Sequence, residues 1–139
     1  MHQRLVASSL LALSLASGAA WAEAPAAAKS FTLTVLAPAA KIGAAAGAKV
    51  EVKPMKGYHI NKDYPTSLKI TAPAGVDVPK PKLSKADGTV TETGAAFDVA
   101  FTAREAGTKS FTGTLSFAVC TDTTCDPQRL PVSFTVDVK

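Results

Sequence analysis

Two cysteines, Cys120 and Cys125, are the residues whose type and spacing point to covalent chemistry. They are the only cysteines among the 139 residues, and the polar segment 121–124 separates them. An even pair in an oxidising compartment is normally a disulfide, whereas the same pair in a cytosolic enzyme would suggest metal binding or transient redox chemistry. The compartment therefore decides how the pair is interpreted.

The N-terminal sequence predicts export. Arg4 precedes an apolar run over 5–16, and small residues then lead to Ala20-Trp21-Ala22, which is the layout of a signal peptide cleaved after Ala22. The apolar run is shorter than the roughly 20 residues that a spanning helix needs, so we expect no membrane insertion after cleavage. We therefore expect a periplasmic protein with three parts: a signal peptide (1–22), a flexible tether (23–29) and one domain (30–139).

Hydrophobic periodicity indicates the elements that must position the cysteines. Apolar and polar residues alternate in six segments: 31–35, 50–52, 68–70, 97–101, 111–119 and 130–138. Glycine and proline punctuate the chain between them, and the glycine-flanked Ala44–Ala46 run is predicted to be part of a long turn. The pattern favours an all-β fold, an immunoglobulin-like antiparallel sandwich of about 6–8 strands, with a small barrel as the alternative. Five of the six phenylalanines lie in the last three segments, which predicts a core centred there.

The strands on either side bring the cysteines together. Cys120 directly follows one predicted strand and Cys125 precedes the next, so facing Cα atoms about 4.5–5.5 Å apart would permit a disulfide. Closing a loop of about six residues stabilises a fold by only about 2 kcal/mol, which leaves a structural and a redox role both open. A polar turn at a strand end predicts an accessible sulfur, although Asp122 and Asp126 would raise a thiolate's pKa.

Other chemistry has little support. The net charge is +4, and the lysines are scattered with few aromatics among them, so no nucleic-acid surface is predicted. Removal of the leader would take Arg4 and lower the charge to +3. Met55 and His59 are two ligand types without a third, so we predict no metal and no cofactor. No phosphate-binding glycine loop or hydrolase motif occurs.

The cysteine segment Gly113–Pro127, followed by the strand 130–138, resembles the N-terminal periplasmic domain of the DsbD family of thiol:disulfide interchange proteins. The segment Gly57-Tyr58-His59-Ile60-Asn61 is similar to a second stretch of that domain. The resemblance implies an immunoglobulin-like sandwich in which Cys120 and Cys125 form the catalytic redox pair. It also implies that Lys85–Glu92 replaces an aromatic cap loop.

In that family the domain takes electrons from a membrane-embedded donor and passes them to thioredoxin-like periplasmic proteins. The resemblance implies the same partners here, with the donor on a separate protein. Tyr58 would line the site, and we add His59 and Asp122 as candidate site-lining residues. Whether the protein is an enzyme stays open. The alternative function is a non-catalytic secreted β-sandwich that binds a partner and carries a structural disulfide.

Overall fold

The computed structural model describes residues 30–139, so the predicted signal peptide (1–22) and tether (23–29) lie outside it. Residues 30–139 form ten strands and one short 3₁₀ helix: β1 (Phe31–Leu36), β2 (Ala45–Pro54), β3 (His59–Ile60), β4 (Ser67–Thr71), β5 (Val76–Asp77), β6 (Lys82–Ser84), η1 (Lys85–Asp87), β7 (Thr89–Thr91), β8 (Gly94–Ala103), β9 (Gly107–Cys120) and β10 (Cys125–Val138). Six of these strands have five or more residues, in agreement with the six to eight predicted.

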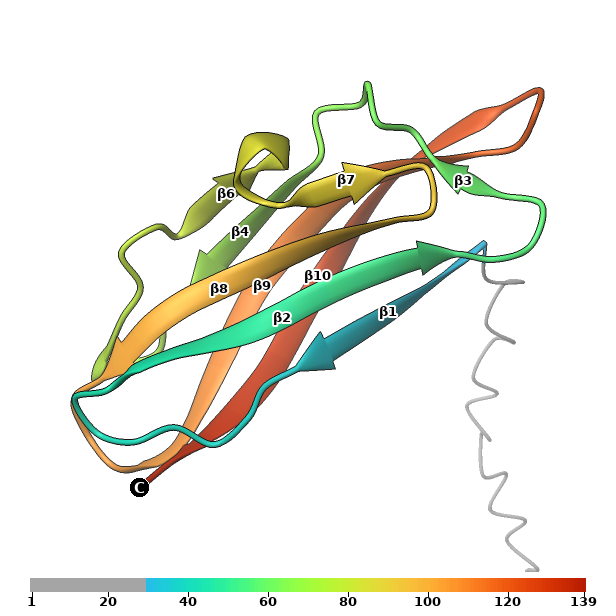
Figure 1. Cartoon of the computed structure of the whole chain (residues 1–139). Coiled ribbons are helices and arrows are strands. Elements are labelled where there is room, and N and C mark those ends of the chain that lie inside the picture. Colours follow the sequence, from blue (N-terminus) through green and yellow to red (C-terminus); the bar gives the residue numbers. More distant parts are fainter. Residues whose placement is uncertain (1–29) are drawn as a thin grey trace, which may run out of the picture.

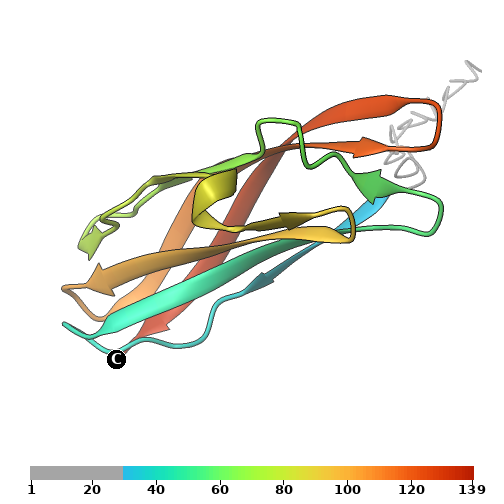
Figure 2. The ribbon, with the colours of Figure 1, turned by 45° about the horizontal axis from the view of Figure 1, so that its top comes forward.

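The strands make two antiparallel sheets packed face to face (Figures 1 and 2). One sheet has the order β1-β2-β8-β5, with β7 also pairing with β8. The other has the order β10-β9-β4-β6, with β3 also pairing with β9. The predicted immunoglobulin-like all-β sandwich is confirmed.

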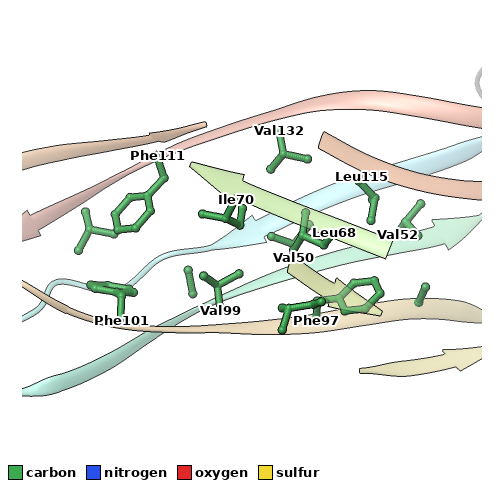
Figure 3. Close-up of a cluster of buried hydrophobic side chains, with 14 of the residues drawn as sticks. Val50, Val52, Leu68, Ile70, Phe97, Val99, Phe101, Phe111, Leu115 and Val132 are labelled. Atoms are coloured by element: carbon green, nitrogen blue, oxygen red, sulfur yellow. The ribbon is translucent and has the colours of Figure 1, made fainter. Parts of the chain in front are cut away.

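Alternating side chains from both sheets fill the space between them (Figure 3). Phe97 and Phe101 of β8 face Phe111 and Phe117 of β9, and all four are at most 2% exposed. The Phe101 and Phe111 ring centroids lie 5.0 Å apart. The core is therefore centred on the phenylalanine-bearing strands, as the sequence predicts.

Two segments differ from the sequence prediction. Ala45 and Ala46 belong to β2 and not to a turn, because they pair with Thr102 and Phe101 of β8. The last strand begins at Cys125, five residues earlier than predicted, and includes Pro127. Proline lacks an amide hydrogen, but β10 is the edge strand of its sheet and at Pro127 it pairs with β9 only, so one side of the strand needs no donor there.

Candidate functional site

The longest hairpin of the sandwich, β9–β10, ends in the two cysteines. Its register runs through fourteen residue pairs from Gly107↔Val138 to Cys120↔Cys125. The predicted disulfide joins the last pair, with Cα atoms 4.0 Å apart. Beyond it the Thr121 amide donates to the Thr124 carbonyl at 2.8 Å, so the cysteines occupy a closely spaced, non-hydrogen-bonded position of the ladder.

The turn between the cysteines is held by one threonine. The Thr121 hydroxyl oxygen accepts from the Thr124 amide at 3.2 Å and from the Thr123 amide at 3.4 Å. Asp122 lies exposed at the tip of this turn. The cysteine pair thus sits where a tightly closed turn meets a long, fully paired ladder.

A row of three side chains crosses the sheet at this end. His59 of β3 pairs with Cys120 of β9, which pairs in turn with Cys125 of β10. Both views show the end of the hairpin beside β3 (Figures 1 and 2). The chain neighbours Ile60 and Val119 face the core, so the row faces the outer side of the sheet.

The two cysteines differ in exposure. Cys125 is exposed, whereas Cys120 is 2% exposed. The access that the sequence predicts is present at Cys125 and absent at Cys120. In the register Cys120 lies between His59 of β3 and Cys125 of β10, so a side chain stands on each side of it.

Tyr58 lies close to the hairpin but on its other face. It lines a pocket of about 290 Å³ together with Ser30, Val119, Thr121, Thr124 and Asp126. Val119 and Asp126 are the chain neighbours of the cysteines, so their side chains point to the opposite face of the sheet. Asp122 is absent from this lining. Among the three candidate site-lining residues, His59 alone shares the row of the cysteines.

Sequence reasoning missed Asn61 as a site residue. Its side-chain amide nitrogen Nδ2 lies 3.9 Å from the Sγ atom of Cys125, within the range of a hydrogen bond to sulfur. The two residues are 64 positions apart in the sequence. The motif that carried the family resemblance ends on Asn61, and that was the only available signal.

The Lys85–Glu92 segment, for which the resemblance implies the place of a cap loop, forms η1 and β7. The Ile60 amide donates to the Glu92 carbonyl at 2.9 Å, and the Lys62 ammonium pairs with the Glu92 carboxylate at 3.4 Å. The Lys85 ammonium donates to the Lys62 carbonyl at 3.1 Å. The segment therefore fixes the backbone of residues 60–62, just after His59, by hydrogen bonds and an ion pair.

Asp87 anchors this segment through an unusually acidic carboxyl group. The pKa of Asp87 is lowered from 3.8 to about 2. The largest cause is a hydrogen bond from Lys80, followed by hydrogen bonds from the Ser84 amide and hydroxyl, both 2.9 Å long, and by the charge of Lys80. Because the pKa is lower in the folded state, the stability that Asp87 contributes is present above pH 3.8 and is lost as the pH falls toward 2.

Replacing Lys80 with methionine removes the largest cause of this shift. In Lys80→Met the Asp87 pKa should rise from about 2 toward 3.8, measured by NMR titration of the carboxyl carbon. Lys82→Met, at a lysine that makes no ion pair with Asp87, should leave the midpoint unchanged. An unchanged midpoint in Lys80→Met would contradict the assigned cause.

Within residues 30–139, no group of three or more His, Cys, Asp or Glu side chains could hold a metal ion. Over the same residues, no helix has the length and apolar character needed to cross a bilayer.

Fold and site together define an antiparallel β-sandwich with a disulfide at the end of its longest hairpin. No protein-family model matches the chain, and no curated protein matches it. Among solved structures, the chain is similar to AggA, the major subunit of aggregative adherence fimbriae type I from Escherichia coli. The TM-score is 0.43 at 12% identity, over 78% of this chain and 94% of that chain. A likeness at this level carries no information on function.

Proposed function

We propose that the chain is a periplasmic thiol–disulfide exchange domain that relays reducing equivalents between a membrane electron donor and thioredoxin-like partners. The observation that carries the proposal is the unequal exposure of the pair, with Cys125 open to a partner and Cys120 buried behind it. The resemblance of residues 113–127 to a redox domain supports the same chemistry.

Electrons would enter through the exposed cysteine. A donor thiolate attacks the Cys125 sulfur, the Cys120–Cys125 bond breaks, and Cys120 leaves as a thiolate that takes up a proton. The second thiolate of the donor then attacks the donor sulfur of the mixed disulfide, and Cys125 leaves as a thiolate. The donor dithiol has become a disulfide and this domain a dithiol, so two electrons have been transferred.

Electrons would leave by the reverse path. The Cys125 thiolate attacks a partner disulfide, and Cys120 then attacks Cys125 to release the reduced partner. The second step is intramolecular, and the hairpin, with its fourteen residue pairs, holds the two cysteine Cα atoms 4.0 Å apart. Such positioning gives a high effective concentration of the resolving thiol, so the mixed disulfide is short-lived.

The reduction potential of the pair tests the proposal. We expect a value less negative than about −300 mV in dithiol redox buffers, since more negative potentials mark inert structural bridges. The Cys120→Ser variant, which lacks the resolving thiol, should in addition accumulate a mixed disulfide with an oxidised thioredoxin-like protein. A reduction potential well below about −300 mV, together with no trapped mixed disulfide, would contradict the exchange function.

A second candidate is a secreted, partner-binding β-sandwich with a structural disulfide. The 2% exposure of Cys120 favours it, because buried sulfur is protected from reductants. This function predicts the opposite outcome of the same experiment, a very negative potential with no mixed disulfide.

A further inference from the structure

We infer that Asn61 is a positioning residue of the cysteine site. Its side-chain amide is a hydrogen-bond donor held against the sulfur of Cys125. Its Nδ2 atom lies 3.9 Å from that sulfur. Its significance for electron transfer rests on the proposed exchange function, but its effect on the sulfur does not.

The orientation of the Asn61 amide group follows from its other contact. The Oδ1 atom accepts from the Asp63 amide at 2.9 Å. A backbone N–H can only donate, so oxygen must occupy that side of the amide group and the NH₂ group must face the sulfur. In this contact the Asn61 NH₂ group therefore donates to the Cys125 sulfur.

The backbone of Asn61 is fixed as well. Its amide donates to the Ala118 carbonyl of β9 at 2.9 Å, and its carbonyl accepts from the Tyr64 amide at 3.2 Å. The first bond attaches Asn61 to the strand that carries Cys120, and the second closes the turn that follows Asn61. The donor is thus held in place before any partner arrives.

A donor at this position acts mainly on the reduced form. A thiolate accepts a hydrogen bond more strongly than a disulfide sulfur, because hydrogen bonds to charged groups are the stronger ones. Asn61 therefore stabilises Cys125 whenever it carries the charge, both as the attacking thiolate and as the leaving group.

The charged groups around Cys125 do not replace this donor. Asp126 on β10 and Asp122 in the turn are negative and disfavour a thiolate. Lys62, after β3, is engaged with the Glu92 carboxylate. His59 on β3 lies beside Cys120 in the register and not beside Cys125. The Asn61 amide is the donor that contacts the Cys125 sulfur itself.

The test uses the Cys120→Ser background, in which Cys125 is the only thiol. Asn61→Ser removes the amide donor and keeps an oxygen for the Asp63 amide, while Asn61→Asp keeps the shape and replaces NH₂ by a charged oxygen. We expect the pH midpoint of iodoacetamide alkylation to rise by about half a unit to one unit, a three- to tenfold loss of thiolate at pH 7. Asn61→Asp should give the larger rise.

Thr123→Asp is the matched control for added charge, because it places a carboxylate in the turn without touching the Asn61 amide. Its midpoint should rise less than that of Asn61→Asp. Unchanged midpoints in both Asn61 variants, with the fold intact by circular dichroism, would overturn the inference. A shifted midpoint in a protein that traps no mixed disulfide would keep the role of Asn61 and reject the exchange function.

Discussion

Cys125 in the Cys120→Ser variant should react with iodoacetamide at least about tenfold faster at pH 8 than Cys120 does in the Cys125→Ser variant, because a buried thiol reacts only when the fold opens locally. Cys120 is 2% exposed and lies between two neighbouring strands, whereas Cys125 is exposed on the edge strand. Mass spectrometry of the alkylated fraction against time measures both rates.

The same measurement in denaturant is the control. Unfolded chains expose both thiols, so the two rates should come close to each other there. Equal rates in the native state would show that Cys120 is also accessible to reagents. The proposal that Cys125 is attacked first and that Cys120 resolves would then lose its basis. A large native difference would assign Cys125 as the residue through which partners are engaged.

The second large effect is expected at Gly113, where β9 and β4 approach closely. An alanine Cβ at Gly113 would lie 2.3 Å from the Lys69 carbonyl oxygen and 2.9 Å from the Ile70 Cδ1 atom. The first of these atoms is backbone, so β4 has to move away from β9. We expect Gly113→Ala to lower the free energy of unfolding by about 2–3 kcal/mol and the Tm by roughly 10 °C.

Gly47→Ala is the matched control, since Gly47 also lies inside a long strand. Its Cβ would meet only the Val99 carbonyl oxygen, at an ordinary 3.6 Å. This variant should change stability by less than about 1 kcal/mol. Calorimetry on both proteins decides, and a Gly113→Ala protein as stable as Gly47→Ala would mean that the two strands do not approach as closely as described.

Displacement of β4 should also reach the cysteine site. β3 and β4 both pair with β9, and the segment that carries Asn61 connects them. Gly113→Ala is therefore expected to disturb the Asn61 contact without altering either cysteine.

Local sequence predicted the strands whose residues alternate strongly. Phe97 to Phe101 and Phe111 to Val119 carry the two-residue period that a half-buried strand needs, and both segments are strands. Ala45 and Ala46 lack that signal, because alanine and glycine bury little surface. They are strand residues through pairing with Thr102 and Phe101 of β8, partners far along the chain that no local pattern reveals.

The site was predictable only in part. The disulfide followed from two cysteines flanking a turn, since that arrangement depends on neighbouring residues alone. The burial of Cys120 depends on β3, and the contact of Asn61 with Cys125 joins residues 64 positions apart. The burial of Cys120 and the Asn61 contact both depend on the pairing of β3 with β9. That pairing exists only in the folded sheet and is not encoded in the local sequence of β3 or β9. The redox role, the partners and the periplasmic location stay predictions.

The long paired ladder behind the cysteines has a consequence for recognition. Opening the bond between Cys120 and Cys125 releases no loop, because the strands on both sides remain hydrogen-bonded to each other. The oxidised and reduced forms should therefore present the same outline to other molecules. A protein that prefers one form has to recognise the sulfur atoms themselves. Under the proposed exchange function, a donor and an acceptor that both react with Cys125 would bind one after the other at the same surface.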